Sequence, residues 1–311
     1  MPQFEFTIDA TTQGVRLDKV VIEALGHKFG RARTRDLFAQ RAVRADGHVV
    51  SKGDLGREGQ LITVQLPDDE GEGAVAEPQA ALDVRLETAD FVVVCKPAGQ
   101  PTAPLEPGEV GTLVGALLGH YPEMGSFGRS AREPGIVHRL DNGTSGLLVA
   151  ARTKPAFEAA LAALRAGEIH KRYLLVCRQE GLAASGVIDI PLAPHPKDTR
   201  RVLACAHERD QARNHPRPAS TSYKVVERIG DLALVEASAP KALRHQLRAH
   251  FAAIDHPIEG DGLYGGDTER IGRQALHAHH LSWKGSGSLA GFAVDADLPE
   301  DMRALLAAAR D

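Results

Sequence analysis

The sequence is poor in cysteine and has no long apolar run. Its 311 residues include three cysteines, Cys95, Cys177 and Cys205, which are too few and too scattered for a disulfide framework or a zinc site. No run of about 18 apolar residues could cross a membrane, and the N-terminus MPQFEFTIDATTQ lacks the basic start and apolar core of an export signal. These absences favour a cytoplasmic protein that is neither exported nor membrane-spanning.

A basic excess, the usual electrostatic footprint of a nucleic-acid-binding protein, is also missing from the whole chain, whose formal net charge is -4. The distribution of charge is uneven, however. Residues 16–58 carry ten lysines and arginines against six acidic residues, whereas residues 68–73 read DDEGEG. A solvated helix face accounts for most charge runs, and contact with RNA is the other interpretation of this basic region.

The first 67 residues predict a small α/β unit. Helical spacing of apolar residues predicts a helix over residues 14–26 and a second over 32–40, an Asp-Gly pair predicts a hairpin over 43–50, and an apolar run predicts a strand over 61–66. This order is similar to the S4 RNA-binding module. The resemblance implies that the arginines at the start of the second helix contact RNA, namely Arg31, Arg33 and Arg35.

Residues 68–80 are acidic, contain Gly and Pro, and have no large apolar side chains, so they predict a flexible linker. A second domain is expected over 81–311. It has short apolar runs that predict strands but no regular strand–helix alternation, which indicates an α+β fold without a parallel sheet of βαβ units. Residues 193–218 have the composition of a long insertion or binding loop.

One stretch of the second domain combines polar and apolar features that suit a site. Residues 138–146 read HRLDNGTSG and lead into the apolar run LLVAA, which predicts a polar loop held by a buried strand. Asp141 lies in this loop two residues after Arg139. A carboxylate in this position can be a nucleophile, a general base, half of an ion pair, or the cap of a turn.

The string HRLDNGTSG resembles the HRLDxxTSG signature of the RluA-type family of RNA pseudouridine synthases. Further matching blocks follow in the family's order: KRY from Lys171, HQLR from His245, HPI from His256, Gly260-Asp261, LYG from Leu263, and LHA from Leu276. The chain departs from the family pattern at Cys95, where Asn is usual before KPxG, and at Leu243, where an arginine is usual.

This resemblance implies a catalytic fold of the α+β class with a bent, largely antiparallel mixed sheet and flanking helices. It also implies isomerisation of uridine to pseudouridine in RNA without a cofactor, by a monomer. Large-subunit (23S) ribosomal RNA is the expected substrate, because family members that carry an S4 module usually act on it, and transfer RNA is the alternative. The chemistry breaks the bond from N1 to C1′, bonds C5 to C1′, and removes the C5 proton.

The resemblance also assigns roles to single residues. Asp141 is the reacting carboxylate, Arg248 pairs with it, and Tyr173 stacks on the uracil and assists removal of the C5 proton. Arg139 would fill the space left by the flipped nucleotide. His138 and Thr144, from the same signature, are expected to bind substrate, as is Arg244, the arginine next to the altered position.

Arg244 has two interpretations. If the helix that carries residues 245–251 begins at or before Arg244, then Arg244 and Arg248 share a helix face and both reach the site. Arg244 would then take over the phosphate-positioning or loop-bracing role of the arginine that Leu243 replaces. Otherwise Arg244 is simply a solvent-exposed side chain.

Two other function classes compete with the synthase. A non-catalytic RNA-binding or ribosome-assembly factor would use the same scaffold, but the presence of Asp141, Tyr173 and Arg248 speaks against it. A glycosidase or nucleoside hydrolase that uses Asp141 would need a second placed carboxylate, which no motif supplies. A metal site is not expected, because the histidines do not have the spacing of a known ligand motif; they are His245, His250, His277, His279 and His280.

Overall fold

The computed structural model describes residues 3–25, 31–66 and 73–310, and these divide into two compact units. One unit comprises residues 1–73 with 129–131, and the other comprises 74–128 with 132–311. The linker expected over 68–80 stays a prediction, and its residues from 74 onward belong to the larger unit. Within the larger unit, the Glu77 carboxylate accepts a hydrogen bond from the Gly111 N–H at 2.8 Å, and the Glu77 N–H donates to the Gly115 carbonyl at 2.8 Å.

The smaller unit contains the two expected helices and an antiparallel sheet in the order β1-β4-β2-β3. The elements are β1 (Gln3–Thr7), α1 (Leu17–Leu25), α2 (Arg31–Ala39), β2 (Val43–Ala45), β3 (His48–Val49) and β4 (Leu61–Gln65). The hairpin between β2 and β3 turns at Asp46 and Gly47, both with positive φ, as its Asp-Gly sequence predicted. Strand β1 was not predicted, and every residue of its QFEFT sequence is at least partly exposed.

The larger unit is built on one sheet that contains nine strands within the described residues. In spatial order they are β5 (Val84–Glu87), β6 (Phe91–Lys96), β7 (Ser145–Ala151), β14 (Leu276–Ser286), β8 (His170–Arg178), β13 (Leu232–Ser238), β12 (Ser220–Ile229) and β9 (Ser185–Asp189), with β15 (Leu289–Asp295) paired to β14. Only the β7–β14 pairing is parallel among these strands. The prediction of a largely antiparallel mixed sheet is confirmed.

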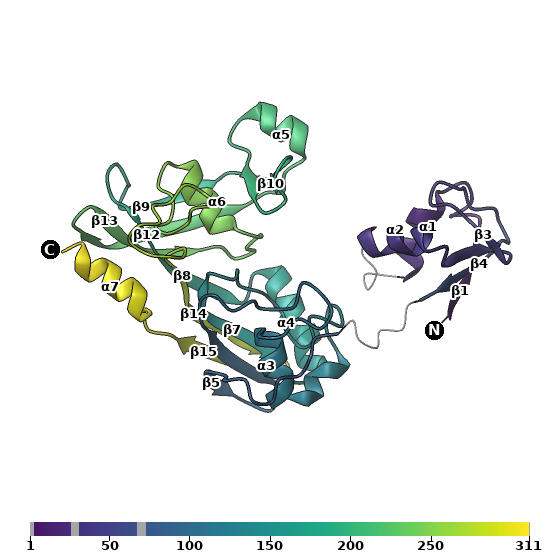
Figure 1. The fold of residues 1–311 in the computed structure, drawn as a ribbon, viewed down its shortest axis with the longest axis horizontal. Helices are drawn as coiled ribbons and strands as arrows, with labels where there is room; N and C mark the ends of the chain where they lie inside the picture. Colours follow the sequence, from purple (N-terminus) through teal and green to yellow (C-terminus); the bar gives the residue numbers. More distant parts are fainter. Residues whose placement is uncertain (1–2, 26–30, 67–72, 311) are drawn as a thin grey trace. The chain divides into compact units, whose positions relative to one another are not determined.

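Helices cover both faces of the β6–β7 part of the sheet (Figure 1). Phe91 and Val93 pack with α4 (Lys154–Ala166), whereas Val92 and Val94 pack with α3 (Leu113–His120). Alternate residues of a strand point to opposite faces, so a strand covered on both sides is apolar throughout. This explains the uninterrupted apolar runs FVVVC and LLVAA.

The other half of the sheet carries α6 (Gln246–Ala253) and α7 (Glu300–Ala308), whose side chains share one core with β8, β12 and β13. Residues 193–218 are not a plain loop. They contribute to β10 (Leu192–Pro194) and contain β11 (Val202–Ala204) and α5 (Glu208–Asn214), which project beside α6 (Figure 1). Each of these pieces is at most seven residues long, too short for a clear periodic signal.

Candidate active site

Asp141 lies in the loop before β7, and backbone hydrogen bonds fix this loop within itself and to the turn after β6. The Thr144 N–H donates to the Asp141 carbonyl at 3.0 Å, and the Gly99 N–H donates to the Asn142 carbonyl at 2.9 Å. After the loop, Gly146 has φ 116°, and a Cβ there would lie 2.3 Å from the Ala278 carbonyl oxygen. Only glycine therefore allows β7 to approach β14 at this point, and this close approach fixes where the loop ends.

Arg248 joins Asp141 to a second carboxylate, that of Asp261. Its Nη1 donates to Asp141 Oδ2 at 3.0 Å, while Nε and Nη2 donate to Asp261 Oδ2 and Oδ1 at 2.6 and 2.8 Å. Side chains of Arg248 and Asp261 are 8% and 1% exposed, against 25% for Asp141. Burial opposes the charge of Arg248, but the hydrogen bonds and charges of Asp261 and Asp141 raise its pKa above the ordinary value. The guanidinium is thus a fixed cation at the carboxylate.

Tyr173 lies on β8, where it pairs with Ala237 of β13 and Ala278 of β14. Its side chain is 7% exposed. Burial, and secondarily the charge of Asp141, raise the pKa of the Tyr173 phenol above its usual value. Tyr173 is therefore a neutral phenol at physiological pH, able to stack and to donate a hydrogen bond but not to act unaided as a phenolate base.

Lys96, at the end of β6, was not predicted as a site residue. Its fully buried ammonium donates to the carbonyls of Pro97, Gln100 and Asn142 at 2.8, 2.7 and 3.0 Å. Burial lowers its pKa to about 8, although the charge of Asp141 favours the cation. Lys96 therefore links the end of β6 to the Asp141 loop through the Asn142 carbonyl and places a positive charge near Asp141. The KPAG sequence alone did not predict this role.

Comparison with known proteins decides the family. Residues 90–253 match the RNA pseudouridylate synthase family. The chain is 31% identical over 99% of its length to the ribosomal large subunit pseudouridine synthase D of Nitrosomonas europaea, covering 88% of that protein. A protein with the same description from Xanthomonas campestris pv. campestris is 32% identical, covering 96% of this chain and 90% of its own. The chain belongs to the RluA-type family of RNA pseudouridine synthases.

Other relatives support the same assignment. The uncharacterized RNA pseudouridine synthase YlyB of Bacillus subtilis is 30% identical over 98% of both chains. Two solved human structures, RNA pseudouridylate synthase domain containing 4 and domain containing 1, each align with a TM-score of 0.55 at 23% identity. They cover 73% and 75% of this chain and 93% and 97% of their own, and show the shared fold. This enzyme is an RNA pseudouridine synthase, an isomerase.

The signature residues expected to bind substrate occupy different environments in the synthase. Arg139 is exposed and donates to Glu133 Oε1 at 2.7 Å. His138 and Thr144 are buried, with the Val149 N–H donating to His138 Nε2 at 3.3 Å and Gln274 Nε2 donating to Thr144 Oγ1 at 3.3 Å. The role of Arg139 toward RNA stays a prediction, whereas the contacts of the other two connect the loop to its neighbours.

Arg244 does not share a helix face with Arg248, so that condition of the takeover hypothesis is wrong. Helix α6 begins at Gln246, and His245 before it has φ 53° and left-handed backbone geometry. Arg244 is exposed, and its Nη2 donates to the carbonyls of Thr199 and Arg201 at 2.6 and 3.2 Å. These contacts fit a loop-bracing role.

Arg35 is exposed in the smaller unit, 3.8 Å from the carboxylate of Asp36. The side chains of Arg31 and Arg33 lie outside the described residues, so their expected role stays a prediction.

The histidines weighed as metal ligands each have other partners. His277 contacts Ser145 at 2.9 Å, His279 contacts Glu236 at 3.0 Å and His280 contacts Asp295 at 2.6 Å. His250 lies between Thr221 Oγ1 and the Ile190 carbonyl, and His245 contacts Tyr264. In the part of the chain that the structure describes, no group of three or more His, Cys, Asp and Glu could hold a metal ion.

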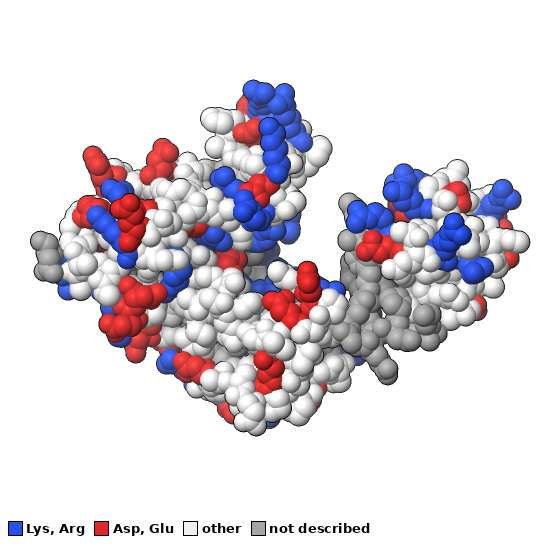
Figure 2. Space-filling model, viewed as in Figure 1, with Lys and Arg blue, Asp and Glu red and all other residues white. Residues whose placement is uncertain are grey.

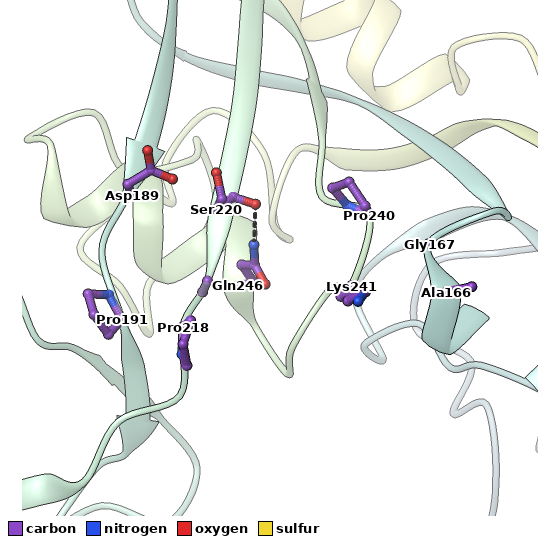
Figure 3. Close-up of a pocket in the computed structure, with 10 residues that line it drawn as sticks. Ala166, Gly167, Asp189, Pro191, Pro218, Ser220, Pro240, Lys241 and Gln246 are labelled. Carbon is purple, nitrogen blue, oxygen red and sulfur yellow. Dashed lines mark hydrogen bonds between the residues drawn. The ribbon is translucent and has the colours of Figure 1, made fainter. Parts of the chain in front are cut away.

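A pocket of about 500 Å³ lies near the N-terminal end of α6 (Figure 3). Gln246 contributes to its wall and donates to the Ser220 carbonyl at 2.9 Å. Three prolines and two alanines make much of the rest of the lining: Pro191, Pro218, Pro240, Ala166 and Ala219. None of Asp141, Tyr173 and Arg248 lines this pocket, so it is separate from the carboxylate site.

Proposed function

We propose that this synthase isomerises uridines of large-subunit ribosomal RNA and that Asp141 is the carboxylate that reacts. The observation that carries the proposal is the hydrogen bond from Arg248 to Asp141 Oδ2, since it holds one oxygen and leaves the other available. Among the described residues no hydrogen-bond partner is found for Asp141 Oδ1. That oxygen can attack the sugar C1′ or take a sugar proton, and both reactions need the ionised form.

The substrate assignment draws on the relatives that span nearly the whole chain. Several carry the description ribosomal large subunit pseudouridine synthase D. The basic residues of the smaller unit, whose sequence resembles the S4 module, support the proposal that this unit binds RNA. A further basic surface lies on the projecting part of the larger unit that carries α5, where Lys and Arg gather (Figure 2). Arg209 and Arg213 are exposed there and form no ion pair with any described residue.

Pseudouridine mapping in total RNA tests the substrate. Cells that lack the protein should lose pseudouridine at one or more positions of large-subunit ribosomal RNA, and a plasmid-borne copy should restore them. The Asp141→Asn variant, expressed at the same level, should restore none, because it keeps the side chain's shape but not its charge. Loss of sites in transfer RNA alone would overturn the ribosomal assignment. Full restoration by Asp141→Asn would overturn the role of Asp141.

A further inference from the structure

His245 stands between the Asp141 site and Tyr264 in an unusual backbone conformation. Its φ of 53° is left-handed, which is uncommon for a residue other than glycine and occurs where the surroundings hold it. The ring is mostly covered, with its side chain 14% exposed. Its Nδ1 lies 3.0 Å from the Tyr264 hydroxyl, and its Nε2 lies 3.7 Å from Asp141 Oδ2. The imidazole therefore spans the gap between a phenol and the reacting carboxylate.

The hydrogen bonds around Tyr264 determine which ring nitrogen of His245 carries the proton. The Val202 N–H donates to the Tyr264 hydroxyl at 2.9 Å. In the described part of the chain, His245 Nδ1 is the acceptor within reach of the hydroxyl's own proton. Burial lowers the pKa of His245, against the opposing charge of Asp141, so the ring is neutral and has one N–H. With Nδ1 accepting, that N–H is on Nε2 and points toward Asp141.

Tyr264 is itself held by two arginines and a hairpin. The guanidinium carbons of Arg248 and Arg201 lie 5.0 and 5.2 Å from the centre of its ring, within cation–π range. Val202, which donates to its hydroxyl, begins β11 of the same hairpin. The phenol therefore has little freedom to turn away from His245.

We propose that His245 is a positioning residue for Asp141, and that Tyr264 fixes the tautomer in which His245 donates through Nε2. The inference rests on the proposed role of Asp141. A donor on Oδ2, beside Arg248, fixes the orientation of the carboxylate and directs Oδ1 at the sugar. The 3.7 Å separation is too long for a hydrogen bond, and it closes when RNA fills the site and excludes water.

Two substitutions of His245 test the contacts of its two ring nitrogens separately. His245→Asn suits the left-handed backbone and keeps a polar group near Tyr264, but it cannot reach Asp141. His245→Gln places an amide N–H near the position of Nε2. With a 5-tritiated uridine transcript of unmodified large-subunit ribosomal RNA, label released to water measures turnover. His245→Asn should lower kcat by about 10- to 100-fold, as expected for loss of a hydrogen bond to a charged group.

The accompanying measurements distinguish positioning from a structural role. KM for the transcript should change less than about twofold, and His245→Gln should recover kcat to within about fivefold of wild type. His120→Asn, a matched change at an exposed histidine outside the site, should leave both constants unchanged. Equal kcat values for the Asn and Gln variants, or a loss that appears in KM alone, would overturn the proposal.

The tautomer part of the proposal is tested through Tyr264. Tyr264→Phe keeps the ring between the arginines and removes the hydroxyl, so kcat should fall. The double variant with His245→Asn should be no slower than His245→Asn alone, because both changes remove the same donor. Multiplied losses would mean that Tyr264 acts by another route. An active Asp141→Asn enzyme would refute the proposed function, whereas inactive Asp141→Asn with fully active His245→Asn would refute this inference alone.

Discussion

The pair formed by Arg248 and Asp261 gives the sharpest stability prediction, because the two side chains are 8% and 1% exposed. Asp261→Asn removes one charge and leaves the guanidinium buried. Breaking a buried pair by removing one partner costs about 3–5 kcal/mol. Asn keeps one acceptor oxygen and Arg248 keeps Asp141 as a partner, so we expect the lower end, about 3 kcal/mol. For a unit of this size, that lowers Tm by about 6–12 °C.

The assay is thermal unfolding followed by circular dichroism, with turnover measured at a temperature where the variant is folded. Glu227→Gln is the matched control, since it removes a carboxylate from the exposed pair with Arg310 at 2.8 Å, and such pairs contribute about 0–1 kcal/mol. Turnover of Asp261→Asn should fall about tenfold or more, because Arg248 is no longer aligned on Asp141. Unchanged Tm and turnover would show that Asp261 does not hold the guanidinium.

Three further changes are expected to have separate effects. Lys96 has a folded pKa of about 8 against an ordinary 10.5, so between these pH values the unfolded chain binds more protons and the free energy of unfolding rises with pH. Lys96→Met should lack this rise when urea unfolding is measured at pH 7.5 and 9.5. The same change in the free energy of unfolding in wild type and Lys96→Met would contradict the prediction. Tyr173→Phe should bind RNA normally and turn over poorly, whereas equal rates would reduce Tyr173 to a stacking surface. Replacing Arg209 and Arg213 by Ser should weaken RNA binding and reduce the salt slope by about 2, and an unchanged slope would remove α5 from the RNA interface.

Elements whose sequence carried a strong local signal were predicted closely. The helix expected over residues 14–26 is observed as α1, Leu17–Leu25, with Leu17, Val20 and Val21 buried. The strand expected over 61–66 is β4, Leu61–Gln65. In both cases, the apolar pattern and the turn residues at each end agree with the tertiary packing, so local reading is sufficient.

Elements with a mixed local signal were missed. Strand β14 reads LHAHHLSWKGS, and its histidines obscure the alternation that marks a strand. Those residues are polar because they meet polar partners across the sheet, as His279 meets Glu236 and His277 meets Ser145. The sequence shows the histidines but not these partners, which come from β13 and β7. A metal site was the alternative that had to be weighed for this reason.

The site residues also fall into those that the sequence predicted and those whose role only the structure shows. Asp141, Tyr173 and Arg248 were predicted because they fall in family motifs. In the structure Arg248 donates to Asp141, and the charge of Asp141 contributes to the raised pKa of Tyr173. Lys96 and Asp261 also fall in quoted motifs, but their roles depend on distances between segments far apart in the chain. Folding brings Lys96, at the end of β6, into contact with Asn142 of the Asp141 loop. It also brings Asp261 into contact with Arg248 of α6.

The altered segment before α6, Leu243 and Arg244, makes its contacts with residues far away in the sequence. Leu243 replaces the usual arginine, and it packs with β10 and β11 residues and Tyr264 in a small apolar cluster. Arg244 donates to two carbonyls of the turn that joins the same two strands. Both residues therefore hold the hairpin that donates to Tyr264 through Val202. In this synthase the segment acts on the hairpin, and Arg248 is left to bind Asp141 and Asp261.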